Sequence, residues 1–404
     1  MVIRPNDAEA LNNRGVALDQ LGRLEDALAD FDRALAIWPD YLEALNNRAS
    51  VLIGLKQPAA ALTSCDKALA IRPDTGQVLN NRGIALRDLG RRDEAVTAFR
   101  QALVAQPDTA DFQTNLGVTL QELGQLELAE ASLRQALPAR TPQVFQTLAT
   151  VLYQMGKVAE ATGIYQQWLA HDPGNPIAQH MTTAAGGTAA VPERARDEYV
   201  AALFDGFADT FDSILAQLEY RAPQILSGML QAERGPNGQP ARILDAGCGT
   251  GLCGPLLRPM ASQLVGIDLS PGMLRNARER QHYYDELAVA ELCTYMSERA
   301  GAFDVIVIAD TLIYFGVLDQ AFRSAHVALA PGGTLAFTLE CQHEADAGPG
   351  YRLEPHGRYT HRTTYVEQAL RQSGFSILKS DTVVLRRERN ADVAGLAILA
   401  RKET

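Results

Sequence analysis

Hydrophobic and small residues recur with a period of 34 residues in the first part of the chain. The strings 12–18, 46–52 and 80–86 begin at this interval. A small residue returns once in each first helix and once in each second helix, at Gly15, Ala49, Gly83 and Gly117 and at Ala27, Ala61, Ala95 and Ala129. This period, with its close helix crossings, is typical of a solenoid of helix pairs. The pattern predicts an all-α array of about five pairs over residues 1–175.

The pattern changes in the second part of the chain. Residues 176–194 lose the period and include the string AAGGTAA, so they are predicted to be a linker. From residue 195 an aromatic-rich helical segment precedes short apolar runs that alternate with helical spacing. The predicted strands are Arg242–Ala246, Leu264–Asp268, Ala288–Leu292, Phe303–Asp310, Thr334–Glu340, Phe375–Leu385 and Val393–Ala400. We therefore expect an α + α/β chain with an α/β domain over 195–404.

Composition excludes several classes of function. The chain has 404 residues, of which 37 are basic and 48 acidic, for a net charge of −11. Because neither part offers a basic surface, we expect no nucleic-acid partner. We expect no membrane association, since no signal-like stretch and no run of about 18 apolar residues occurs. Five cysteines without a CxxC pair argue against disulfides and structural zinc. No metal is expected, and the cytoplasm is the predicted location.

The first predicted strand ends in an acid and runs into a glycine-rich turn. Asp245 precedes the string AGCGTG, and Leu252 stands where a dinucleotide-binding loop requires glycine. Such a turn between a strand and a helix lets backbone N–H groups approach a ligand closely. The second predicted strand ends at Asp268, where a carboxylate can accept hydrogen bonds from both hydroxyls of a ribose.

The string DAGCGTG resembles motif I of class I S-adenosylmethionine-dependent methyltransferases, and DLSPGML resembles the family's DxSxxML. The 34-residue units resemble tetratricopeptide repeats, and the combination resembles predicted bacterial methyltransferases that carry such repeats. The resemblance implies a Rossmann-like, mostly parallel sheet of seven strands with an antiparallel last strand, lid helices over 195–232, and S-adenosylmethionine as cofactor. It assigns to the cofactor Asp245, Gly247, Cys248, Gly249, Thr250, Gly251, Asp268, Leu269, Met273, Glu291, Leu292 and Asp310. Glu291 departs from the family, which usually has an aspartate beside the adenine amino group.

The residues that act on the acceptor leave a weaker pattern. Transfer of an activated methyl group needs proximity, orientation and a dry pocket, and it needs a base only if the nucleophile arrives protonated. Residues 340–361 follow the fifth strand and contain His343, His356 and His361, whose spacing does not fit a pair of metal ligands. The string YTHRTTYV resembles a family stretch that favours His361 as the base. The alternative is a structural histidine.

Polar residues repeat on the first helices of the array. Asn13, Asn47, Asn81 and Asn115 occupy one register in four successive units. They predict a ladder of amides in the concave groove, which would bind an extended protein or peptide. The alternative is hydrogen bonding between helices. A second ladder consists of Arg14, Arg48 and Arg82, and we expect these arginines to pair with acids of the array.

Three hypotheses about function follow. In the first, the chain methylates an oxygen or nitrogen of a protein, a peptide or a carrier-bound small molecule, which the array helps to recognise. In the second, the acceptor is a free metabolite and the array serves only assembly, for instance as a homodimer. In the third, the chain is a scaffold that senses the cofactor without catalysis.

Overall fold

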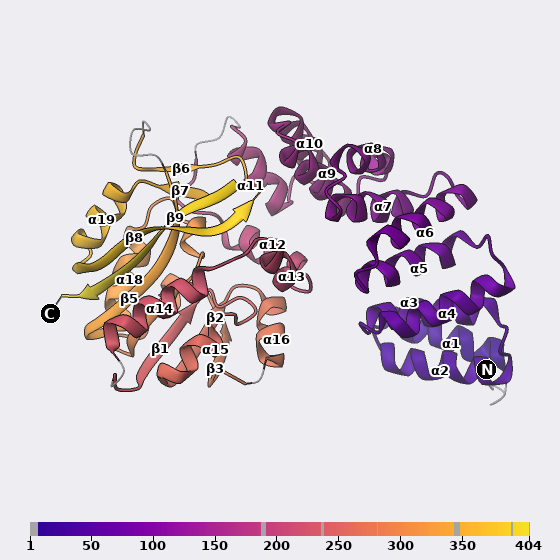
Figure 1. Cartoon of the computed structure of the whole chain (residues 1–404), viewed down its shortest axis with the longest axis horizontal. Coiled ribbons are helices and arrows are strands. Elements are labelled where there is room, and N and C mark those ends of the chain that lie inside the picture. The colour runs from indigo at the N-terminus through magenta and orange to yellow at the C-terminus, as the bar shows by residue number, and fades with distance from the viewer. Residues whose placement is uncertain are drawn as a thin grey trace. The chain divides into compact units, whose positions relative to one another are not determined.

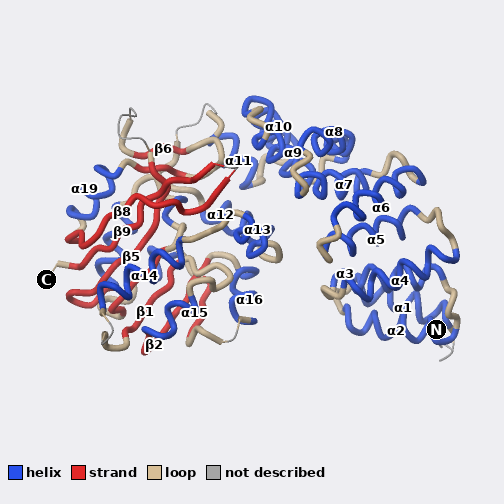
Figure 2. Tube along the Cα trace, in the orientation of Figure 1, coloured by secondary structure: helices blue, strands red, loops and turns tan. Residues whose placement is uncertain are grey.

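The computed structural model describes residues 7–186, 191–235, 238–280, 282–342, 348–388 and 391–403. The chain forms two compact units, Met1–His171 and Asp172–Thr404. The first unit is built from helices, and the strands gather in the second (Figure 2). Each unit is described by itself.

Within residues 7–171, ten α-helices form five consecutive pairs (Figure 1). They are α1 (Ala8–Gln20), α2 (Leu24–Ile37), α3 (Leu42–Gly54), α4 (Pro58–Ile71), α5 (Gly76–Asp88), α6 (Arg92–Ala105), α7 (Ala110–Glu122), α8 (Leu126–Ala136), α9 (Pro142–Gln154) and α10 (Val158–His171). Each helix contacts the next along the chain. The prediction of an all-α solenoid is confirmed.

Small residues of the array stand where two helices cross most closely. A Cβ atom at Gly15 would lie 2.7 Å from the ring of Phe31, and one at Gly83 would lie 2.5 Å from the ring of Phe99. Carbon atoms in contact prefer a separation of about 3.5–4.0 Å. A side chain at either position would therefore push the two helices of the pair apart.

The second unit is an α/β domain. Its described helices are α11 (Pro176–Ala184), α12 (Asp197–Phe207), α13 (Phe211–Gln217), α14 (Ala222–Arg234), α15 (Gly254–Leu257), α16 (Pro271–Glu279), α17 (Leu292–Ser297), α18 (Asp319–Ala328) and α19 (Thr363–Gln372). Its strands are β1 (Ala241–Ala246), β2 (Ala261–Asp268), β3 (Glu286–Val289), β4 (Phe303–Ile308), β5 (Leu329–Cys341), β6 (Tyr351–Leu353), β7 (Tyr359–His361), β8 (Phe375–Glu388) and β9 (Ala391–Lys402). Helix α14 packs on β5 and β9, with Leu226 and Leu230 in the core.

The strands form one sheet in the order β3-β2-β1-β4-β5-β7-β6, and β9 pairs with both β5 and β8. Strands β1 to β5 pair in parallel, whereas β9 is antiparallel to its two neighbours. The predicted Rossmann-like architecture with an antiparallel last strand is confirmed. The described part of the sheet has nine strands rather than seven, because β6 and β7 extend it beside the end of β5. Each is three residues long and leaves no alternating pattern in the sequence.

Helix α11 corrects the prediction that residues 176–194 are a linker. The side chain of Asn175 accepts two backbone N–H groups of the first turn, which favours a helix start. Helix α11 contacts α12, and its last residue, Ala184, packs in one apolar cluster with Leu353 and Tyr359. The helix therefore belongs to the second unit. Residues 187–190 of the predicted linker lie outside the described residues.

Candidate cofactor and acceptor site

The glycine-rich turn after β1 requires glycine for backbone and packing reasons. The backbone of the turn is in the left-handed region at three glycines, with φ values of +80° at Gly247, +55° at Gly249 and +84° at Gly251. Residues other than glycine rarely adopt such values. A Cβ atom at Gly247 would lie 2.0 Å from Oγ1 of Thr311, which follows β4. Gly247 also donates its N–H to the carbonyl of Ile267 at 2.8 Å. The turn is thus held between the ends of β2 and β4.

Asp245 places a buried carboxylate beneath this turn. Its side chain has no exposed surface, and its Oδ2 accepts a hydrogen bond of 2.6 Å from the hydroxyl of Tyr284. Oδ1 has no partner among the described residues. Burial raises the pKa of Asp245 to about 7, although the bond from Tyr284 opposes the shift. The unpartnered oxygen fits the amino group of S-adenosylmethionine, which is a cation and a hydrogen-bond donor.

Asp268 ends β2 beside the same turn. Its Oδ2 accepts the N–H of Gly249 and its Oδ1 accepts the N–H of Ser270, both at 2.9 Å. Burial raises the pKa of Asp268, and these backbone bonds oppose the rise. A carboxylate oxygen accepts more than one hydrogen bond, so both oxygens can still receive ribose hydroxyls. Leu269 and the fully buried Met273 follow at the start of α16.

Two acids of α12 and α13, which lie in the predicted lid region, contact the segments that carry these residues. Asp205 of α12 accepts the N–H of Gly272 at 3.0 Å. Asp212 of α13 accepts the hydroxyl of Thr250 at 2.5 Å and pairs with Arg280. Helix α12 is therefore tied to the first turn of α16, and α13 is tied to the glycine-rich turn and to the residue after α16.

Glu291 follows β3, which ends at Val289, three residues earlier than the sequence pattern predicts. Its carboxylate caps α17 by accepting the N–H groups of Cys293 and Thr294, at 3.0 and 2.8 Å. It also accepts a bond of 2.8 Å from Arg194. The contacts of Glu291 and of the buried Leu292 with adenine stay predictions.

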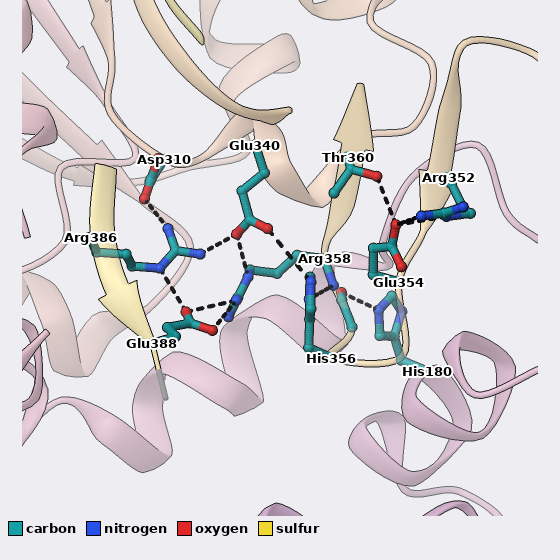
Figure 3. Close-up of polar contacts among 11 residues, drawn as sticks. His180, Asp310, Glu340, Arg352, Glu354, His356, Arg358, Thr360, Arg386 and Glu388 are labelled. Atoms are coloured by element: carbon teal, nitrogen blue, oxygen red, sulfur yellow. Dashed lines mark hydrogen bonds and ion pairs between the residues drawn. The ribbon is translucent and has the colours of Figure 1, made fainter. Parts of the chain in front are cut away.

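Asp310 lies after β4 in a network of buried charges (Figure 3). Its carboxylate accepts bonds from Thr338 at 2.9 Å and from Nη1 of Arg386 at 2.8 Å. Arg386, on β8, also pairs with Glu340 at the end of β5 and with Glu388. The side chain of Arg386 is 5% exposed. This contact set gives Asp310 an ionic partner that the sequence did not predict, and its contact with the cofactor stays a prediction.

Arg358 closes the network from the loop between β6 and β7. It bonds Glu340 at 2.6 Å and Glu388 at 2.8 Å. Burial alone would raise the pKa of Glu388. The positive charges of Arg358 and Arg386 outweigh this effect and lower that pKa to about 2. Burial and Arg358 lower the pKa of His356, 3.6 Å from Glu340, to about 4. At neutral pH Glu388 is therefore ionised, and the imidazole of His356 is neutral.

His361 lies within β7 and has no exposed surface. Its Nε2 donates to the carbonyl of Gly316 at 3.2 Å, its ring stacks on Tyr365, and its Nδ1 has no partner among the described residues. Burial lowers the pKa of His361 to about 4. A base must touch its acceptor, so this burial bears against catalysis, and the role of His361 stays a prediction. His343 lies outside the described residues.

Sequence reasoning missed Tyr284 and the two arginines of the network. Tyr284 precedes β3 in a segment with no motif. Arg386 stands in the charged string RRERN, which a turn explains equally well. The pattern ends the predicted strand at Leu385, whereas β8 continues to Glu388. The sequence therefore gives no sign that Arg386 is a buried strand residue, which would need acidic partners.

The asparagines of the array bond to one another. In three successive units the asparagine of the ladder donates Nδ2 to Oδ1 of the other asparagine of the preceding unit. The pairs are Asn47 to Asn12 (3.0 Å), Asn81 to Asn46 (3.0 Å) and Asn115 to Asn80 (2.9 Å). Asn13 is exposed in the first unit. Because each donating residue keeps its Oδ1 without a partner among the described residues, binding of a partner stays a prediction.

The arginine ladder pairs inside the array, as expected. Arg14 bonds Asp30, Arg48 bonds Asp32 at 2.6 Å, and Arg82 bonds Asp66 at 2.9 Å. Over the described ranges, no three metal-binding side chains cluster. No described helix is long and apolar enough to cross a membrane.

Comparison with protein families agrees with this geometry. Residues 244–337 match a methyltransferase domain. Residues 8–41, 40–106 and 80–144 match tetratricopeptide repeats. The predictions of tetratricopeptide repeats and of an S-adenosylmethionine-dependent methyltransferase domain are confirmed.

Two curated relatives resemble part of the chain. Methyltransferase-like protein 27 of Homo sapiens is 39% identical over 141 residues, which cover 33% of this chain and 55% of that protein. Malonyl-[acyl-carrier protein] O-methyltransferase of Pseudescherichia vulneris is 34% identical over 142 residues, 34% of this chain and 52% of that protein. The chain spans about half the length of these relatives.

Solved structures resemble each unit separately. A thermophilic tetratricopeptide protein of Thermus thermophilus is 27% identical, with a TM-score of 0.39 over 44% of this chain and 98% of that one. A Burkholderia thailandensis 1,6-didemethyltoxoflavin-N1-methyltransferase with bound S-adenosylhomocysteine is 20% identical, with a TM-score of 0.42 over 54% and 94%.

Proposed function

We propose that this chain, which combines tetratricopeptide repeats with a methyltransferase domain, methylates an oxygen or nitrogen nucleophile of a protein, a peptide or a carrier-bound molecule. The observation that carries the proposal is the pair of acids at the glycine-rich turn. Asp245 offers a buried oxygen without a partner among the described residues, and Asp268 is fixed by two backbone N–H groups. A chain that had lost cofactor binding would have no reason to keep a buried carboxylate oxygen without a partner, which costs stability.

S-adenosylmethionine, when bound, supplies a methyl group on sulfur that is already activated for displacement. The chain's own residues then have to orient both reactants and exclude water. Asp205 and Asp212 hold the lid helices on the loops of the site. The ring of Phe204, on α12, packs edge to face with Phe211, on α13, and with Tyr314. In the transfer the bond from the methyl carbon to sulfur would break and the bond from that carbon to the acceptor would form, which leaves S-adenosylhomocysteine. An ionised carboxylate needs no base, whereas an acceptor that arrives protonated would also give its proton to a base or to water.

The array gives the acceptor a second place to bind. Malonyl-[acyl-carrier protein] O-methyltransferase acts, by its name, on a group carried by a protein. An acceptor held in the groove would meet the methyltransferase domain at a raised effective concentration, without any new contact at the reacting atom. A carrier-bound acyl group is therefore the first acceptor to test.

The proposal is tested by incubating the full chain with S-adenosylmethionine labelled in its methyl group. One reaction contains malonyl-[acyl-carrier protein], and others contain the protein and small-molecule fractions of a cell lysate. Label in the protein fraction or in the carrier supports the proposal. Label only in the small-molecule fraction supports a metabolite as acceptor, and binding of the cofactor without any transfer supports a sensor.

A further inference from the structure

Helix α11 directly follows the repeat array in the chain and carries a buried histidine. Nε2 of His180 donates a hydrogen bond of 2.8 Å to the carbonyl of Gly357, which fixes the tautomer of the ring. The imidazole ring of His180 also stacks on the ring of Tyr199, with centroids 3.8 Å apart. His180 is 7% exposed.

The loop that receives this bond fits closely against α11. Gly357 has a φ of +87°, and a Cβ atom there would lie 2.7 Å from the sulfur of Met181 and 2.9 Å from the hydroxyl of Tyr199. Only glycine allows both this backbone conformation and this approach. The neighbouring strands add an apolar contact, since Leu353 and Tyr359 pack with Ala184 at the end of α11.

The same loop carries two residues of the charged network. His356 and Arg358 flank Gly357, and Figure 3 shows His180 beside them. Arg358 reaches from the loop to Glu340 and Glu388, so the position of the loop sets where its guanidinium lies. Glu340 ends β5 at the edge of the sheet where open α/β folds bind their ligands.

We infer that His180 is a positioning residue, which holds the loop 354–358 and thereby sets the place of Arg358 and His356 at the acceptor face, the edge of the sheet around Glu340 where the acceptor is expected to bind. The inference rests on the proposed function for the acceptor, but the geometry it invokes can be measured without one. It also extends the functional unit beyond residues 244–337, because a helix outside the matched domain completes this face.

His180→Phe is the informative variant, because phenylalanine can stack on Tyr199 but cannot donate a hydrogen bond. The readout is the charge of His356, followed by nuclear magnetic resonance in the full chain labelled at histidine. His356 faces Arg358, Glu340, Glu388 and Glu354. At pH 5.5 it is neutral in the parent chain, whose His356 has a pKa of about 4. Release of the loop should hydrate the ring and bring its pKa toward the ordinary value of about 6.5, so that at least half is protonated at pH 5.5.

Two further variants keep the inference open to refutation. His180→Gln retains a donor and should keep His356 neutral at pH 5.5. Gln179→Ala changes the residue just before His180 on the same helix. It should also keep His356 neutral at pH 5.5 and leave the methyl-transfer rate unchanged. Affinity for S-adenosylmethionine should be the same in all three, since the cofactor residues lie on other loops.

A folded His180→Phe chain with neutral His356 would overturn the inference, and so would a protonated His356 in His180→Gln. Neither result would touch the proposed function. Conversely, a parent chain that transfers no label to any fraction would end the proposed function, while the His356 readout would still decide the role of His180.

Discussion

The hydroxyl of Tyr284 lies 2.6 Å from Oδ2 of Asp245 and donates a hydrogen bond to it. Tyr284 also packs against the glycine-rich turn, because its ring would meet a Cβ atom at Gly251 or Gly254 at 3.1 and 3.0 Å. The tyrosine thus fixes one oxygen of the carboxylate and leaves the other for a ligand. It does so from the segment before β3, which the family motifs do not include.

Affinity for S-adenosylmethionine should fall as the pH drops below about 7. Burial raises the pKa of Asp245 to about 7, and only its ionised form attracts the cofactor's amino group. The affinity should therefore decline toward about tenfold per pH unit on the acidic side. Tyr284→Phe removes a bond to the ionised form, so the decline should begin at higher pH, with about tenfold weaker binding at pH 7. Calorimetry from pH 5.5 to 8.5 measures both, with Tyr283→Phe as the control.

Asp268→Ala should weaken binding of S-adenosylmethionine by about 1–3 kcal/mol while the fold persists. The variant removes the acceptor of the ribose hydroxyls and also releases the N–H groups of Gly249 and Ser270. Glu279→Gln, which removes an exposed acid from α16, should bind normally. Equal affinity of the two variants in calorimetry would remove Asp268 from the cofactor site.

The sequence predicts the repeat array and the central strands because both leave periodic traces. Gly15 and Phe31 recur as a small and a large residue in later units, since every helix pair has the same crossing. The helix α11 leaves no such trace. It occurs once, is nine residues long, and is preceded by a proline-containing turn that also fits a linker.

The two halves of the site differ in the same way. Asp245 and Asp268 follow strands in a fixed loop pattern, so their positions can be read from the sequence. The contacts of Arg386 cannot, because they join β8 to β5 and to the turn after β4, over separations of up to 76 positions. His361 was predicted from a resemblance of residue types, and burial is a property of the folded chain.

Arg386→Met should destabilise the protein by roughly 3–5 kcal/mol, because it leaves buried carboxylates without their cation. Arg386 contacts Asp310, Glu340 and Glu388. Its neighbour Arg387 is the matched control, since its side chain is 48% exposed. Arg387→Met should cost less than about 1 kcal/mol. Urea unfolding of both variants gives the comparison, and similar losses would show that the network contributes little to stability.

His361 can be tested by the pH dependence of turnover at saturating cofactor. If His361 is the base, its pKa of about 4 places the acidic limb near pH 4, and turnover should stay flat between pH 5 and 8. His361→Phe should then lower turnover by roughly 10² to 10⁴ with unchanged cofactor affinity. A folded His361→Phe chain that keeps full turnover would assign His361 to packing against Tyr365.

The asparagine ladder makes a prediction that separates binding from packing. Asn81 is 5% exposed and donates Nδ2 to Asn46, and its Oδ1 has no hydrogen-bond partner among the described residues. Asn81→Ala and Asn46→Ala both delete this bond, so each should reduce the stability of the array by about 1 kcal/mol. Only Asn81→Ala removes a member of the ladder. If the ladder holds the acceptor, labelled methyl transfer into the protein fraction should fall at least about threefold further in Asn81→Ala, mainly through KM.

The comparison of Asn81→Ala with Asn46→Ala is decisive because both variants delete the same hydrogen bond. Urea unfolding verifies that their stability losses agree, so any difference in transfer belongs to the groove. Asn47 and Asn12 provide the same pair one unit earlier, and the effect should recur there if an extended chain spans several units. Equal transfer by both members of each pair would mean that the amides only join neighbouring repeats. The array would then serve assembly, and recognition of the acceptor would have to come from the methyltransferase domain alone.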